Sequence, residues 1–154
     1  MKLSKHFTLE EMTVSQTAVR KGINNNPRAT ALSNLKWTCR NMEYVRTHLH
    51  DLPIFVSSGY RSPALNKAIG GARTSAHTKG FAVDFRCPGF GTPYQVAKAL
   101  AEEADRQETF IEFDQLISEF GRWVHISFDR KMRGKVMTAK KVRGKTVYSL
   151  GINK

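Results

Sequence analysis

Two histidines and one aspartate have the types and spacing to do chemistry. His77 and Asp84 lie seven positions apart in the segment GARTSAHTKGFAVDF, and His125 follows in WVHISF. Two imidazoles and one carboxylate form a ligand set typical of catalytic zinc, which keeps its fourth position for water. Bound zinc acidifies that water toward neutrality, so that it can attack a carbonyl group. The alternative is an ordinary turn that runs into a core strand.

The strands that carry these residues are expected to aim Asp84 and His125 to the same side of a sheet. Successive side chains of a strand alternate between its two faces. In FAVDF and WVHISF the apolar residues that share the core face are Phe81, Val83, Phe85, Val124, Ile126 and Phe128. Asp84 and His125 therefore point away from the core, where Ala82 leaves room for a cleft. His77 precedes Gly80 by three residues, on a loop that can bend back over this face.

Helices are expected in the first part of the chain. TLEEM predicts a capping box formed by Thr8 and Glu11. Asn26 is the expected N-cap of a helix of about twenty residues with Pro27 at its first position. Its apolar stripe comprises Leu32, Leu35, Cys39, Met42, Val45 and Leu49. GTPYQVAKAL predicts another helix, with a threonine cap and a proline at the first position.

Strands are expected to cluster later. LPIFVSS is a β-rich run, two strands flank a turn at Gly121, and strand-like runs surround RGK. This order predicts an α+β fold in which helices pack against a central, largely antiparallel sheet. Residues 1–154 are expected to form one domain, with a basic C-terminal hairpin at about 130–150.

The composition is strongly basic. Twenty-five Lys and Arg stand against thirteen acidic residues, a net charge of +12, and eight of the basic residues lie between Arg130 and Lys145. This charge suits a polyanionic partner, whether nucleic acid, a teichoic acid or lipopolysaccharide surface, or anionic peptidoglycan. No apolar run is long enough for a membrane helix, and MKLSKHFTLEEM shows no cleavable secretory signal. Cys39 and Cys87 are expected to be free thiols in a reducing cytosol.

Several blocks of the sequence resemble one family. SAHTKGFAVD followed by WVHISF resembles the SxHxxGxxxD…H pattern of the D-alanyl-D-alanine zinc peptidases. That group includes D-Ala-D-Ala carboxypeptidases, vancomycin-resistance dipeptidases, phage L-alanyl-D-glutamate endopeptidases and the zinc fold of hedgehog domains. The resemblance covers nearly the whole chain and is greatest to the small phage and prophage branch. It implies a hedgehog/DD-peptidase-like fold and one Zn²⁺ per chain, held by His77, Asp84 and His125.

The resemblance also points to Glu119 as the general base. Glu119 lies six residues before His125, the spacing at which hedgehog domains carry a glutamate. Other branches place an acid three residues before the histidine, where this chain has Arg122. The alternative is a surface glutamate at the end of a strand, and Asp114 is then the next candidate base.

The turn after Glu119 decides which way its side chain points. A two-residue turn of Gly121 and Arg122 would direct Glu119 into the core. A three-residue loop, Phe120–Gly121–Arg122, would place it opposite Trp123, on the side of His125. Because a buried charge is costly, the three-residue loop is expected.

Four further residues are candidates for substrate contact. Arg61, in SGYRSP, matches the arginine that the family uses near the scissile carbonyl or the substrate carboxylate, and a guanidinium can stabilise an oxyanion. Ser75 matches a substrate-holding position of the dipeptidases, although it could equally cap a turn. Tyr60 and Trp123 are expected either to flank the cleft or to belong to the core.

The favoured hypothesis is a zinc-dependent peptidoglycan peptidase, a phage or prophage endolysin that hydrolyses an amide of the stem peptide or cross-link. It would be a monomer that waits in the host bacterial cytoplasm before lysis, and its charge would hold it on an anionic cell-wall or outer-membrane surface. A D-Ala-D-Ala carboxypeptidase would need export. A non-catalytic, zinc-stabilised cell-wall-binding module would not need Glu119 and Arg61, and specific nucleic-acid binding rests on charge alone.

Overall fold

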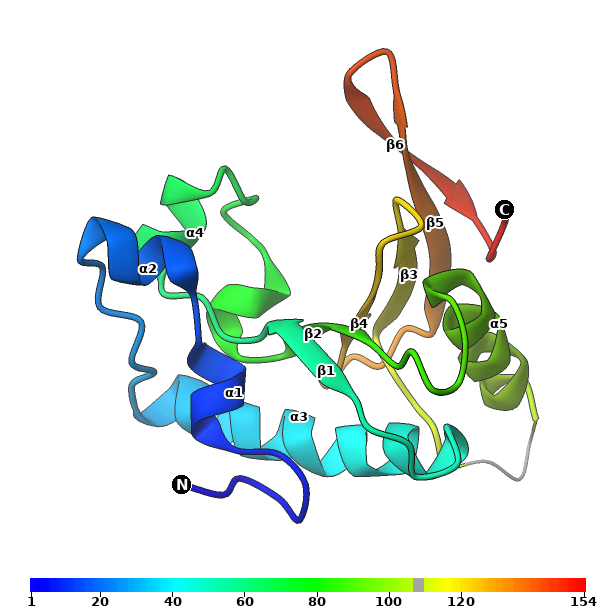
Figure 1. The fold of residues 1–154 in the computed structure, drawn as a ribbon, viewed down its shortest axis with the longest axis horizontal. Coiled ribbons are helices and arrows are strands. Elements are labelled where there is room, and N and C mark those ends of the chain that lie inside the picture. Colours follow the sequence, from blue (N-terminus) through cyan, green and yellow to red (C-terminus); the bar gives the residue numbers. More distant parts are fainter. Residues whose placement is uncertain (107–109) are drawn as a thin grey trace.

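The fold combines one six-stranded sheet with helices, and the computed structural model describes residues 1–106 and 110–154. The helical elements are α1 (Leu9–Thr13), α2 (Gln16–Lys21), α3 (Ala29–His48), α4 (Pro63–Ala68), the 3₁₀ turn η1 (Ala76–Lys79) and α5 (Pro93–Ala104). The strands are β1 (Phe55–Ser58), β2 (Ala82–Arg86), β3 (Gln115–Glu119), β4 (Trp123–Ser127), β5 (Lys135–Val142) and β6 (Lys145–Leu150). Figure 1 shows α3 crossing below the sheet, and the hairpin of β5 and β6 rising away from the body.

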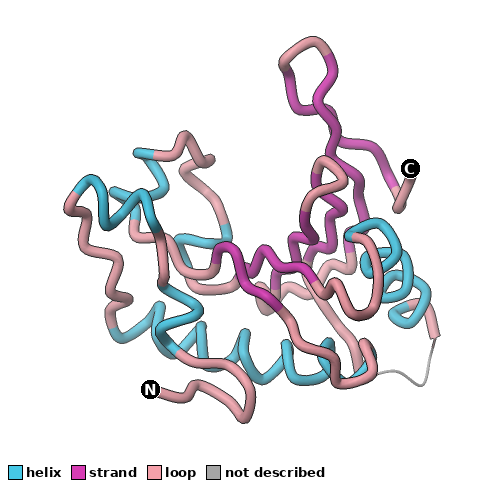
Figure 2. The backbone as a smooth tube through the Cα atoms, viewed as in Figure 1, coloured by secondary structure: helices cyan, strands magenta, loops and turns pink. Residues whose placement is uncertain are grey.

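The sheet has the order β1-β2-β4-β3-β5-β6. Its neighbouring strands are antiparallel except β3 and β5, which run parallel. In Figure 2 the strands form one continuous run from the centre of the molecule into the projecting hairpin. The expected α+β fold with a largely antiparallel sheet is therefore confirmed.

Helices α3 and α5 cover one face of the sheet, because each carries an apolar stripe at helical spacing. The core that they form with the strands is one cluster, which includes Leu35, Cys39, Met42, Val45, Val83, Phe85, Val96, Leu100, Leu116, Val124 and Ile126. The core residues of β2 and β4 are the alternating apolar ones predicted from the sequence. The opposite face of these strands carries Asp84 and His125 and is not covered by α3 or α5.

Helix caps are predicted correctly at two places and wrongly at a third. The capping box of Thr8 and Glu11 is present, and Thr92 caps α5 ahead of Pro93. The prediction of Asn26 as the N-cap of α3 is wrong. This helix begins at Ala29, and the cap residue, Arg28, makes no side-chain cap hydrogen bond.

The asparagines before α3 form hydrogen bonds with loop backbone and do not cap the helix. The Asn24 side chain accepts a hydrogen bond from the backbone of Asn26. Asn25 donates to the carbonyls of Thr13 and Tyr60 and accepts from the backbone of Ser62. These bonds tie the segment to the end of α1 and to the loop of Tyr60 and Ser62, and α3 begins only after it, at Ala29.

The C-terminal strands form the hairpin expected around RGK, with Arg143 and Gly144 between them at positive φ. Most of β6 and the outer half of β5 are exposed. Cys39 and Cys87 are both buried and free. Within residues 1–106 and 110–154, no helix has the length and apolar character needed to cross a membrane.

Candidate active site

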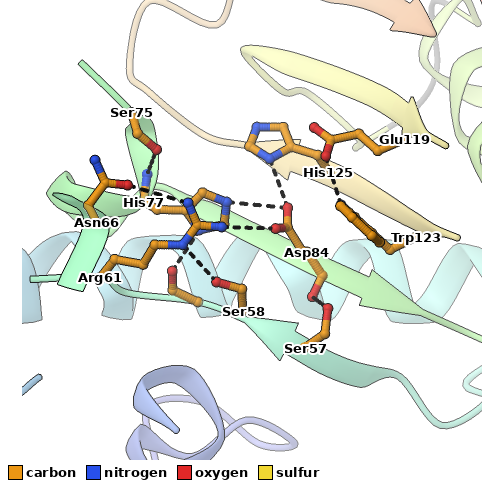
Figure 3. A network of polar contacts seen from close by, with 11 residues as sticks. Ser57, Ser58, Arg61, Asn66, Ser75, His77, Asp84, Glu119, Trp123 and His125 are labelled. Carbon is orange, nitrogen blue, oxygen red and sulfur yellow. Dashed lines mark hydrogen bonds and ion pairs between the residues drawn. The ribbon is translucent and has the colours of Figure 1, made fainter. Parts of the chain in front are cut away.

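Three side chains from separate elements converge on the uncovered face of the sheet. His77 comes from η1, Asp84 from β2 and His125 from β4, and Figure 3 shows both imidazoles turned toward the carboxylate. His125 Nδ1 lies 2.9 Å and His77 Nε2 3.3 Å from Asp84 Oδ1. One potential ligand atom from each residue lies within 4.8 Å of the other two. Atoms bound about 2.1 Å from a tetrahedral ion are roughly 3.4 Å apart, so this donor set fits a metal ion.

The backbone of Gly59 fixes the orientation of His77. His77 Nδ1 lies 2.7 Å from the carbonyl oxygen of Gly59. A carbonyl can only accept, so Nδ1 carries the proton and Nε2 keeps its lone pair for a ligand. Gly59 cannot be replaced easily, because a Cβ there would lie 2.4 Å from the carbonyl oxygen of Met12. Close packing of α1 on this loop thus determines which nitrogen of His77 faces Asp84.

Arg61 holds the second oxygen of Asp84. Its Nη2 lies 3.4 Å from Asp84 Oδ2, its Nε donates to Ser58 Oγ at 3.0 Å and its Nη1 to Asn66 Oδ1 at 3.4 Å. The buried Asn66 is itself held by a bond to the carbonyl of Ala72. The guanidinium therefore supports the carboxylate of a candidate metal ligand and also lines the cleft.

Burial and mutual contact shift the pKa values of the residues in this cluster. Burial would raise the pKa of Asp84, but the charges and hydrogen bonds of His77 and His125 outweigh it and hold that pKa far below its usual range. Burial lowers the pKa of His77, against the attraction of Asp84. Asp84 is therefore an anion and His77 a neutral imidazole at neutral pH, which are the forms that bind a metal. Burial lowers the pKa of His125, but the hydrogen bond and charge of Asp84 outweigh it and raise that pKa, so a metal ion would have to displace a proton from His125.

Glu119 lies on the same face, at the end of β3. It pairs with Trp123 across the hairpin, so the expected three-residue loop is present. Phe120 and Gly121 both have positive φ, and Arg122 is the additional residue. Glu119 Oε2 accepts a hydrogen bond of 2.8 Å from Trp123 Nε1, and no other bond to the carboxylate is present in the described residues. Oε1 therefore remains available to accept a proton.

The surroundings of Glu119 suit a general base better than those of Asp114. Burial raises the pKa of Glu119, and the charge of Asp84 adds to this effect against the opposing charge of His125. A raised value brings the carboxylate closer to the working pH of proton transfer. Both oxygens of Asp114 instead bind Arg133, whose hydrogen bonds hold the pKa of Asp114 below its usual range.

The remaining candidate residues take different places. Ser75 is the N-cap of η1, accepts from the backbone of His77, and lines the cleft. Trp123 is half-buried and reaches the site through its bond to Glu119. Tyr60 is 7% exposed and lines a separate depression with Asn26 and Pro63. The structure thus places Ser75 in the cleft beside the candidate metal ligands and Trp123 behind Glu119, whereas the Tyr60 side chain lies outside this cleft.

The site opens into a cleft of about 820 Å³. Lining residues that the sequence gave no reason to single out are Lys79, Gln115, Ile117, Lys131, Met137 and Tyr148. They come from η1, β3, the segment after β4, and the C-terminal hairpin. Lys79 lies inside SAHTKGFAVD, whereas the other residues belong to no motif named above and are brought to the cleft by the pairing of distant strands.

The arrangement defines a class of protein, a metal-dependent hydrolase with a buried His/Asp/His ligand set and a neighbouring carboxylate. The family model of Peptidase M15 matches residues 5–127, most of the chain. The chain therefore belongs to the peptidase M15 family, whose members are zinc-dependent. The matched residues include the three candidate ligands and Glu119, and the match ends before β5. A comparison with curated proteins found no match.

A zinc ion held by His77, Asp84 and His125 would supply a Lewis acid and an acidified water. Residues of the chain would orient the ligands of this ion and transfer the protons of the reaction. Arg61 contacts the Asp84 carboxylate and would offer positive charge to an oxygen that becomes negative in such a reaction. Glu119 Oε1 is placed to take a proton from the attacking water and to pass it to a leaving amine.

Replacing any one of the three ligands with alanine should remove the metal. We expect purified wild type to contain one zinc per chain, and His77→Ala, Asp84→Ala or His125→Ala to retain less than about one tenth of it, because two protein ligands hold zinc poorly. Elemental analysis of the purified proteins measures this. His48→Ala, which changes a histidine paired with Glu103 elsewhere, is the control and should retain full zinc. Full zinc content in all three ligand variants would contradict the assignment.

Glu119→Gln should abolish proton transfer and leave the metal in place. Turnover is expected to fall by roughly 10²–10⁴ with unchanged zinc content. Because the pKa of Glu119 is raised, its basic form increases with pH only above the ordinary glutamate range, and wild-type kcat should rise in that window. The variant should lose this rise. A near-normal rate with an unchanged pH profile would remove Glu119 from the mechanism.

Proposed function

We propose that this protein is a zinc-dependent peptidoglycan peptidase that hydrolyses an amide bond of the stem peptide or of the cross-link, in the manner of a phage or prophage endolysin. The observation that carries the proposal is the buried His77–Asp84–His125 cluster with Glu119 beside it on one face of the sheet. This set supplies the ligands and the base that amide hydrolysis needs. The protein would remain in the host cytoplasm until lysis and act as a monomer.

Endopeptidase activity fits the cleft better than carboxypeptidase activity. Lining residues lie on both sides of the metal ligands, from Thr74 and Ser75 on one side to Met137 and Tyr148 on the other. A cleft with walls on both sides of the reacting centre accommodates a chain that continues in both directions. A carboxypeptidase needs instead a closed end that recognises a terminal carboxylate.

The tip of the hairpin supports an additional interaction with an anionic surface. Lys140, Arg143 and Lys145 are exposed on the outer part of the hairpin. Lys140 Nζ donates to the backbone oxygen of Lys154, whereas no ion pair of Arg143 or Lys145 is present among the described residues. A cluster of like charges on a projecting hairpin attracts a polyanion over about a Debye length. A teichoic acid, lipopolysaccharide or peptidoglycan surface would supply such a polyanion.

Digestion of purified peptidoglycan tests the proposed activity directly. We expect the wild type to release new amino and carboxyl termini from an internal stem or cross-link amide, identified by mass spectrometry, and His125→Ala to release none. Release of terminal D-alanine alone would identify a carboxypeptidase instead. Absence of any new terminus with a zinc-loaded protein would contradict the proposal.

Charge reversal at the hairpin tip should separate wall binding from catalysis. The triple variant Lys140→Glu, Arg143→Glu, Lys145→Glu is expected to bind purified walls roughly tenfold more weakly near 0.1 M salt, with a flatter salt dependence. Hydrolysis of a soluble stem peptide should stay within about twofold. A sedimentation assay with walls and a peptide assay measure the two effects.

A matched control has the same change in net charge at another place. The variant Lys2→Glu, Lys5→Glu, Lys21→Glu alters three exposed lysines away from the hairpin. It should bind walls more tightly than the tip variant. Equal weakening by both would assign wall binding to net charge alone.

A further inference from the structure

The C-terminal hairpin lies beyond the segment that defines the family, yet two of its side chains reach the active-site cleft. The family match ends at residue 127, whereas β5 and β6 span Lys135–Val142 and Lys145–Leu150. Met137 from β5 and Tyr148 from β6 line the same cleft as the metal ligands. The hairpin therefore adds a wall to the site that the matched part of the chain does not provide.

The strand register places Met137 in one row with two of the candidate metal ligands. Asp84 pairs with His125, His125 with Ile117 and Ile117 with Met137, so the four form one row across β2, β4, β3 and β5. Directly paired residues lie on the same face of a sheet. Met137 is thus the continuation of the metal-ligand row, separated from His125 only by Ile117.

A second row on the same face contains Glu119 and Tyr148. Glu119 pairs with Ala139, and Ala139 with Tyr148. Only the methyl group of Ala139 stands between the two longer side chains. Burial raises the pKa of the Tyr148 hydroxyl, and the charge of Glu119 raises it further. Tyr148 and Glu119 therefore lie in one row on the same face of the sheet, with Ala139 between them.

We propose that Ile117, Met137 and Tyr148 form an apolar subsite that binds the side chain of the substrate residue whose amine leaves. The assignment rests on the proposed function. A base that hands its proton to the leaving amine must lie next to that nitrogen, so the residue bearing the nitrogen lies on the Glu119 side of the metal. In Figure 3, Arg61 and Ser75 lie on the opposite side of Asp84 from Glu119.

The chemistry of the subsite selects an uncharged aliphatic side chain. Ile117 and Met137 offer apolar surface, and Tyr148 is 56% exposed in the free protein, so a ligand can cover its ring. An aromatic residue with a large exposed face gains binding energy when an apolar group covers it. The ring, not the hydroxyl, is the recognition element.

The test compares two adjacent residues of β6 that point to opposite faces. Tyr148→Ala removes the proposed wall, whereas Val147→Ala truncates an apolar residue that is 47% exposed on the other face. The substrate is a synthetic cross-linked stem-peptide dimer, which contains every amide bond that the proposed function includes. Its hydrolysis gives kcat and KM, and titration into Glu119→Gln protein with and without Tyr148→Ala gives binding without turnover.

We expect Tyr148→Ala to raise KM, and the dissociation constant in the Glu119→Gln background, roughly five- to tenfold with kcat within about twofold. Tyr148→Phe and Val147→Ala should match the wild type. Melting temperatures recorded in parallel should stay alike, since Tyr148 is on the surface.

Equal KM values for Tyr148→Ala and Val147→Ala in an active enzyme would overturn the subsite and leave the proposed function standing. A loss in Tyr148→Phe as large as in Tyr148→Ala would overturn its apolar character. A zinc-loaded wild type that neither binds nor cleaves the dimer would overturn the proposed function and the subsite together.

Discussion

The buried carboxylate of Asp84 is the constraint around which the rest of the structure is arranged. A charged carboxylate away from water is costly unless cations and hydrogen-bond donors surround it. Asp84 is 5% exposed, and its two oxygens contact His77, His125 and Arg61. Each partner is held in turn by a different loop or strand. A divalent cation among the same atoms would add to this compensation, so the anion and the metal stabilise each other.

The alternation of apolar and polar side chains along β2 and β4 places Asp84 and His125 on the same face of the sheet. Val83 and Phe85 bury one face against α3 and α5, so Asp84 must emerge on the other. Since the side-chain period is two, a slip of one residue between β2 and β4 would place the carboxylate in the apolar core and the phenylalanine in the cleft. The apolar core thus specifies the register, and the register brings Asp84 opposite His125.

The sequence could reveal the parts of the site that depend on local periodicity and on the cost of burying charge. The two faces of FAVDF and WVHISF follow from alternation, and the three-residue loop after Glu119 follows from the penalty for a carboxylate in the core. Both appear in the structure. The family resemblance added the pairing of His77 with this face, which spacing alone left open.

Long-range contacts explain what the sequence could not reveal. The start of α3 was misplaced because Asn25 bonds to Thr13, Tyr60 and Ser62, which no pattern near residue 26 indicates. The support of Arg61 by Asn66 depends in the same way on how a loop folds back. The position of Tyr148 needs the parallel pairing of β3 with β5, which joins segments separated by β4.

That parallel pairing links Met137 and Tyr148 of the proposed subsite to Glu119. Asp114, just before β3, binds Arg133 through both oxygens, and its carbonyl accepts from the backbone of Lys135 at the start of β5. At the other end of β3, the backbone of Phe120 donates to the carbonyl of Ala139. The strand that ends in Glu119 is therefore fixed at both ends to β5 and along its length to β4. Because β3 pairs with β4 on one side and with β5 on the other, a shift of the Glu119 backbone relative to His125 would also displace Met137. The distance between the reacting centre and the proposed apolar subsite is thus determined by the sheet itself.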